Sequence, residues 1–83
     1  MNFDEDKIYR LLDFYRNQYP ELVLRYAFNP IGLYINFYIG FTSENHRERF
    51  YASIPADEKT AAKVNLCIID FLADLSKKGI PLK

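Results

Sequence analysis

The segment Leu33–Phe41 (LYINFYIGF) alternates between two kinds of side chain with a period of two residues. Its odd-numbered positions are all leucine, isoleucine or phenylalanine, whereas its even-numbered positions are tyrosine, asparagine or glycine. Successive side chains of a strand point to opposite faces of a sheet, so the segment predicts a strand with one apolar face and one face of tyrosines and an amide. The apolar face has to be buried, and the rest of the chain must supply the cover.

Two further segments, 22–28 and 48–54, alternate in the same way and predict a strand before and a strand after the central one. The Asn-Pro-Ile-Gly sequence at 29–32 has the residue preferences of a type I turn, and the polar stretch 42–47 predicts a longer loop. The three strands are therefore expected to pair antiparallel. In this assignment Leu33 and Phe50 both point into the core.

One amphipathic helix is predicted before the three strands in the sequence, and another after them. The first begins at a cap, Asn2 or Asp4, and ends before Pro20, which disfavours a helical conformation at the preceding residue. The second is predicted to start with Pro55, a residue suited to the first helical position, and to run to Lys78. Gly79 then acts as its stop signal.

The second helix carries two apolar stripes where a surface helix normally has one. The core stripe consists of Ala61, Val64, Ile68, Phe71, Leu72 and Leu75. The second stripe consists of Ala62, Leu66, Ile69 and Ala73. We favour the interpretation that the first helix covers the second stripe, because small domains usually pack neighbouring helices around one core. The alternative is a homodimer interface.

These elements predict an α+β fold formed by one domain over residues 1–83. It is a two-layer sandwich of a three-stranded antiparallel sheet and two helices, in the order α-β-β-β-α, with both helices on one face of the sheet. The opposite sheet face is left without cover from the chain itself.

This free face is where a functional site is expected. By strand parity it collects three tyrosines, two arginines and an asparagine. They are Arg25, Tyr34, Asn36, Tyr38, Arg49 and Tyr51. Tyrosine and arginine are the residue types that dominate protein interfaces, although tyrosine is also a good strand former on any half-exposed surface.

Charge weighs against a nucleic-acid ligand, because 11 basic and 11 acidic residues give a net charge of zero. Bases could still stack on the tyrosines of the free face. The predicted element order is also similar in topology to that of double-stranded RNA-binding domains. Those domains begin their second helix with lysines, whereas this chain has Asp57 and Glu58 in that stretch.

Catalytic and metal-binding patterns are weak in this sequence. His46 and Cys67 are the single histidine and cysteine, which is too few for a zinc site. Asp70 and Asp74 lie one helical turn apart, but the lysines that follow favour a solvated charged face. The sequence therefore predicts no enzyme activity, no metal and no cofactor. One cysteine, no secretion signal and no membrane-spanning run predict a cytoplasmic protein without a membrane partner.

The function that best fits these observations is that of a small non-enzymatic protein-binding module. Such a domain could inhibit a host or phage defence protein, or a toxin, by occluding its surface with the tyrosine and arginine face. The alternative function is nucleic-acid binding. An alternative contact surface is the His46–Arg49 stretch together with Lys59 and Lys63.

Overall fold

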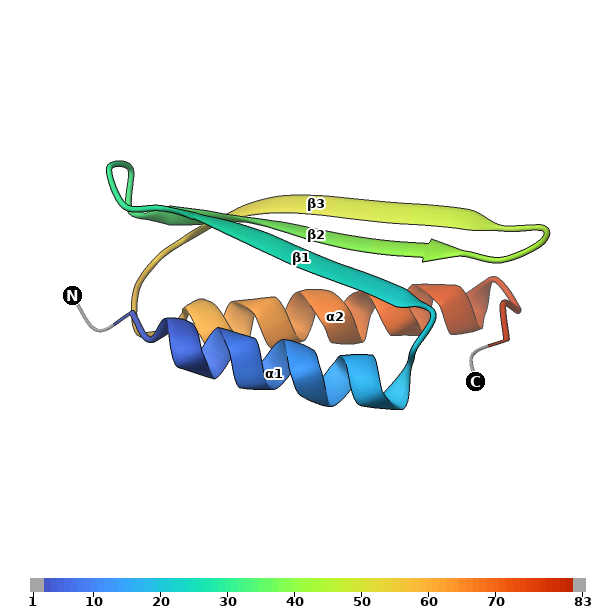
Figure 1. Ribbon diagram of the computed structural model, residues 1–83. Helices are drawn as coiled ribbons and strands as arrows, with labels where there is room; N and C mark the ends of the chain where they lie inside the picture. The colour runs from blue at the N-terminus through green and yellow to red at the C-terminus, as the bar shows by residue number, and fades with distance from the viewer. Residues whose placement is uncertain (1–2, 82–83) are drawn as a thin grey trace.

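The computed structural model describes residues 3–81 and contains the five predicted elements in the predicted order. Helix α1 spans Glu5–Gln18, strands β1, β2 and β3 span Leu22–Asn29, Tyr34–Thr42 and Arg47–Pro55, and helix α2 spans Thr60–Lys77 (Figure 1). Strand β2 lies in the middle of the sheet and pairs antiparallel with both neighbours. The α+β fold, the element order and the three-stranded antiparallel sheet are confirmed.

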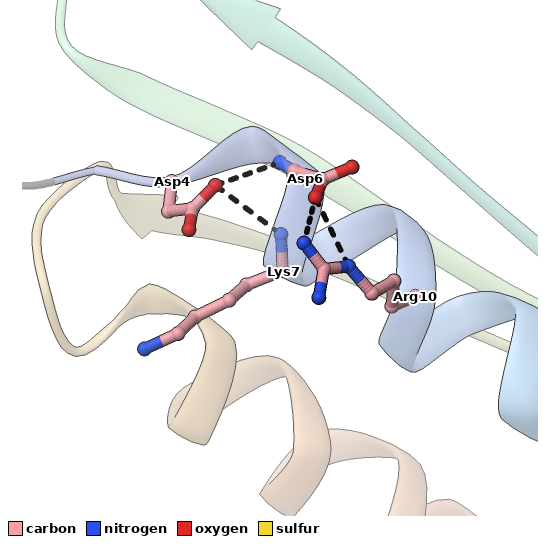
Figure 2. A network of polar contacts seen from close by, with 4 residues as sticks. All are labelled: Asp4, Asp6, Lys7 and Arg10. Atoms are coloured by element: carbon pink, nitrogen blue, oxygen red, sulfur yellow. Dashed lines mark hydrogen bonds and ion pairs between the residues drawn. The ribbon is translucent and has the colours of Figure 1, made fainter.

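The start of α1 is fixed by Asp4 (Figure 2). Its carboxylate accepts hydrogen bonds from the backbone N–H groups of Asp6, at 3.0 Å, and Lys7, at 3.4 Å. This cap satisfies donors that have no partner inside the helix. The Asp6 carboxylate in turn accepts the Arg10 guanidinium one turn later, with Nε at 3.0 Å. Asn2, the other predicted cap, lies outside the described residues.

The hydrophobic core forms between the two helices and one face of the sheet. Figure 1 shows α1 and α2 running along the same side of the three strands. The core takes the odd-numbered residues of β2 and buried residues of both helices. Its largest fully buried side chains are Phe37, Ile8, Leu12, Leu24, Ile35, Ile39, Ile68 and Leu75. Asn36 and Tyr38 alternate with these core residues and belong to the other sheet face.

The loop between β1 and β2 differs from the prediction at its last residue. Asn29 accepts hydrogen bonds from the N–H groups of Ile31 and Gly32, which stabilises the turn as expected of an asparagine in this position. The left-handed conformation then falls on Leu33, with φ of 54°, and β2 starts only at Tyr34. The expectation that Leu33 faces the core is wrong, because the turn rotates this half-exposed residue out of the strand alternation.

The start of α2 also differs from the prediction. Pro55 is the last residue of β3, opposite Tyr34, and the helix begins at Thr60. Strand pairing continues to Pro55 because a proline at the end of an edge strand removes no hydrogen bond from the ladder. The buried Thr60 hydroxyl accepts the Asp57 N–H and donates to the Pro55 carbonyl, both at 2.7 Å. These bonds join the strand end to the helix start.

The end of α2 agrees with the prediction. Gly79 follows the helix with φ of 72°, a conformation that glycine adopts without the steric penalty of a side chain. The N–H of Ile80 then bonds to the Leu75 carbonyl at 3.0 Å, and both side chains are buried. The chain turns back sharply here and adds one more residue to the core.

The second apolar stripe of α2 (Ala62, Leu66, Ile69 and Ala73) is exposed. Leu66 and Ile69 retain 59% and 45% of their accessible surface. Helix α1 packs on another flank of α2, where the Tyr15 hydroxyl donates to the Asn65 side chain at 2.6 Å. The interpretation that α1 covers the stripe is therefore wrong, because α1 contacts the flank of α2 that carries Asn65 and leaves Leu66 and Ile69 exposed.

Candidate functional site

The sheet face opposite the core contains a row of three side chains, one from each strand. Arg25 lies opposite Tyr38, and Tyr38 lies opposite Tyr51. The two tyrosine rings contact each other, with centroids 4.8 Å apart and planes inclined by 50°. Tyr51 is 68% exposed, and neither tyrosine hydroxyl has a hydrogen bond to another residue in the 3–81 range. Both hydroxyls are thus available to a ligand.

Gly40 determines how Tyr38 lies on this face. A Cβ atom at Gly40 would stand 3.0 Å from Cε2 of Tyr38 and would collide with its hydroxyl group. The tyrosine ring therefore extends along its own strand and covers the glycine. Val23 and Arg49 are the neighbours of Gly40 on the two outer strands. Val23 lines a shallow depression together with Arg25, Tyr38 and Tyr51.

The sheet face is positively charged although the chain as a whole is neutral. Its outward positions on the three strands include Arg25, Arg47 and Arg49 and no aspartate or glutamate. Within residues 3–81, none of these three arginines makes an ion pair. Because the net charge is zero, the compensating acidic residues lie elsewhere on the molecule. The face can therefore attract negative charge without competition from its own residues.

Two of the predicted site residues are engaged within the protein. The Tyr34 hydroxyl accepts a hydrogen bond from the Asn29 amide at 3.1 Å, and the Tyr34 ring occupies the space where a Cβ of Gly32 would stand. The Asn36 side chain accepts a hydrogen bond from the Ser53 hydroxyl at 2.8 Å. Tyr34 and Asn36 share the face but stabilise the hairpin and the strand pair. The accessible cluster is formed by Arg25, Tyr38, Arg49 and Tyr51.

Two exposed residues next to this cluster were not assigned to the sheet face by the sequence analysis, although Arg47 was part of the alternative contact surface. Val23 shares the parity of Arg25 in β1, so the alternation itself carried the signal. Arg47 was assigned to the loop, but β3 starts at this residue and pairs it with Thr42. Arg47 lines a second depression with Tyr38, Thr42 and Arg49. The accessible cluster thus extends to the hairpin end of β2 and β3.

The alternative surface predicted from His46–Arg49, Lys59 and Lys63 does not form a cluster. Glu48 of β3 is bound by Lys78, with Nζ and Oε1 2.6 Å apart, so the start of β3 lies beside the C-terminal end of α2. Figure 1 shows the β2–β3 hairpin and the start of α2 at opposite ends of the molecule. The basic residues of the two segments therefore cannot contact one ligand of small size.

A groove runs between β3 and α2 on the helix side of the sheet. Phe50 faces the helix layer as predicted, but it remains 37% exposed because it belongs to an edge strand. It lines the groove with Cys67 and Phe71. Burial raises the pKa of the Cys67 thiol, and the negative charge of Asp70 raises it further. A thiol of raised pKa is a poor nucleophile at neutral pH, so the groove has no activated cysteine.

Metal-binding groups are not gathered in the described part of the chain, where no three histidine, cysteine or acidic residues could hold one ion. Asp74, one of the two aspartates on α2, pairs with Lys78 at 3.0 Å. Neither helix in residues 3–81 has the length and apolar character needed to cross a membrane. Comparison of the chain with protein-family models, curated proteins and solved structures gives no match.

Proposed function

We propose that this protein is a small non-enzymatic protein-binding module that occludes an acidic surface of its partner with its sheet face. The observation that carries this proposal is the row of Arg25, Tyr38 and Tyr51, in which two contacting aromatic rings lie beside an arginine without an ion pair. Inhibition of a defence protein or of a toxin by occlusion would need no chemistry beyond this contact surface.

The chemistry of the row favours a carboxylate-bearing partner. Tyrosine buries a large area with little loss of conformational freedom, and arginine presents a planar fork of donors that matches a carboxylate. Arg47 and Arg49 extend the positive charge toward the hairpin, and the face has no acidic residue to repel the partner. The arginines of this face would therefore neutralise the carboxylates of an acidic protein surface and donate hydrogen bonds to them.

Nucleic-acid binding is the second candidate, and the same charge distribution favours it. The sequence argument against nucleic acid depended on the net charge of zero. The three arginines nevertheless make this face locally positive. Bases could stack on the Tyr38 and Tyr51 rings while the arginines contact phosphates. We rank this function second because only three cations lie on the face, and few phosphate contacts give weak affinity at physiological salt.

The experiment compares a triple variant and a double variant with the wild type for their capture of partners. Arg25→Ala/Tyr38→Ala/Tyr51→Ala removes the row, and Tyr9→Ala/Arg10→Ala removes the same residue types from the exposed surface of α1. Wild-type and variant proteins are immobilised and exposed to lysate with and without nuclease. Direct binding of a single-stranded oligonucleotide and of a polyglutamate peptide is measured in parallel.

A protein captured by the wild type and the α1 variant after nuclease treatment, but not by the row variant, supports the proposal. Oligonucleotide binding that falls steeply with salt, and capture that nuclease abolishes, support the second candidate instead. A protein interface centred on tyrosines depends on salt only mildly, through the charges at its rim. Undiminished capture by a folded row variant would mean that the sheet face is not the contact surface.

A further inference from the structure

The exposed stripe on α2 has the spacing of a helix–helix contact. Ala62, Leu66, Ile69 and Ala73 are separated by four, three and four residues, which is the a/d pattern of one heptad-type seam. They lie on the side of α2 opposite the buried Val64 and Leu75. This stripe is separate from the sheet face and has no role in the function proposed above.

Helix α1 adds a third large apolar residue to the same surface. Phe14 is 55% exposed, and its ring packs edge-on against the ring of Tyr15, with centroids 5.3 Å apart. The Tyr15 hydroxyl bonds to Asn65, the residue immediately before Leu66. Phe14 therefore lies on the helix layer beside a residue that contacts α2, and it joins Leu66 and Ile69 as a large exposed apolar side chain there. Tyr9, which is also exposed on α1, contacts Tyr26 of β1 instead.

Two charges of opposite sign, Lys63 and Asp70, lie on one flank of the stripe near its centre, whereas Lys59 and Lys77 lie toward its ends. Lys63 follows Ala62 and Asp70 follows Ile69, so both side chains lie along one flank of the stripe, and both are exposed. Neither makes an ion pair with another of the described residues. If two α2 helices pack antiparallel with Leu66 against Ile69 of the second copy, the twofold axis brings Lys63 close to Asp70 of the other chain, twice. A parallel pair would leave these charges without partners of opposite sign.

We propose that two copies of this protein associate through their helix layers, with the α2 helices antiparallel and Lys63 of each chain paired with Asp70 of the other. The contact has only Phe14, Leu66 and Ile69 as large apolar residues from each chain. Such a contact is at the small end of specific interfaces, so a dissociation constant in the micromolar range or weaker is expected. The zero net charge of the chain adds no general repulsion between copies.

The test uses two charge-reversal variants that should each weaken the dimer alone and restore it when mixed. Sedimentation velocity over a concentration series into the millimolar range should show a monomer–dimer equilibrium for the wild type. Lys63→Asp and Asp70→Lys alone each place like charges together twice and should weaken the dimer about tenfold or more. An equimolar mixture of the two variants restores both pairs and should dimerise again. Glu44→Lys, which changes the charge as Asp70→Lys does but lies in the β2–β3 loop, should dimerise like the wild type.

Leu66→Glu provides a second variant and should give a folded monomer by sedimentation and circular dichroism. The proposal is overturned if the wild type stays monomeric throughout the series. It is also overturned if the single charge variants dimerise as well as the wild type, or if mixing them restores nothing. In those cases the stripe either stays exposed or pairs in another geometry.

Discussion

Tyr38 of β2 and Tyr51 of β3 lie directly opposite each other in the strand pair, and their ring centroids are 4.8 Å apart. The contact holds two large side chains in place before any partner arrives. Preorganised side chains lose less conformational entropy on binding, so more of the contact energy becomes affinity. The pair is therefore the place where small changes should separate binding from stability.

Truncation of the exposed member of the pair tests this separation. We expect Tyr51→Ala to lower partner affinity by on the order of 2 kcal/mol, roughly thirtyfold. The free energy of unfolding should fall by only about 1 kcal/mol, the size of an aromatic pair contact. Titration calorimetry and chemical denaturation measure the two effects. A stability loss larger than the affinity loss would assign the pair to the fold rather than to binding.

Gly40 should act on binding through Tyr38. The methyl group of Gly40→Ala would occupy the space of the Tyr38 ring and force it to rotate away. We expect partner affinity to fall about as far as it does in Tyr38→Ala. In the Tyr38→Ala background the same glycine change should cost no further affinity, because there is no ring left to displace. Equal, additive losses in the two backgrounds would contradict this mechanism.

The two faces of β2 should respond oppositely to charge. Phe37 is fully buried, so Phe37→Asp places an unpaired carboxylate in the core and should abolish the cooperative thermal transition. Tyr38→Asp places the same group on the sheet face and should leave the transition largely intact. Thermal melts of the two variants compare the same introduced carboxylate at two adjacent positions. Loss of the transition in Tyr38→Asp alone would show that the sheet is inverted relative to the helices.

The Thr60 hydroxyl should stabilise the start of α2. Thr60→Val keeps the volume of the side chain but removes its hydrogen bonds to Pro55 and Asp57, and we expect it to cost about 2 kcal/mol of unfolding free energy. Thr60→Ser keeps the hydroxyl and should cost about 1 kcal/mol for the lost buried methyl group. Urea denaturation distinguishes the variants. A serine variant less stable than the valine variant would mean that packing of the methyl group, rather than hydrogen bonding of the hydroxyl, explains the buried threonine.

Leu33 should be a site where glycine stabilises the protein. Its left-handed conformation is costly for a residue with a side chain, and Leu33→Gly is expected to raise the free energy of unfolding by about 1 kcal/mol. Ile31→Gly, in the same loop but without a positive φ, serves as the matched control and should give no gain. A gain in both variants would point to the loss of exposed apolar surface instead of relief of strain.

The sequence predicted most of the architecture because one constraint acts on every strand residue. The strict alternation of Leu33–Phe41 identified the buried Phe37 and the outward Tyr38, and the register then places Arg25 and Tyr51 beside Tyr38. These predictions depend only on the period of a strand. The central row of the candidate site follows from the same alternation, whereas Arg47 joins it only because β3 starts earlier than the alternation predicted.

The errors occur where contacts beyond local sequence decide the outcome. Pro55 has the local properties of a helix start, but continued pairing with β2 keeps it in the strand. The alternation placed Leu33 in the strand and facing the core, whereas the turn extends to Leu33, which adopts the left-handed conformation. Burial of the Leu66 stripe depended on the lateral position of α1, which no local pattern encodes.

The separation of the sheet face from the α2 stripe has a consequence for valency. In the dimer proposed above, the helix layers meet at the centre and the two sheets lie on the outside, so their tyrosine rows point in opposite directions. Such a dimer cannot place both rows on one flat partner surface. It would instead crosslink two partner molecules, and its avidity would be greatest for partners that are themselves multivalent.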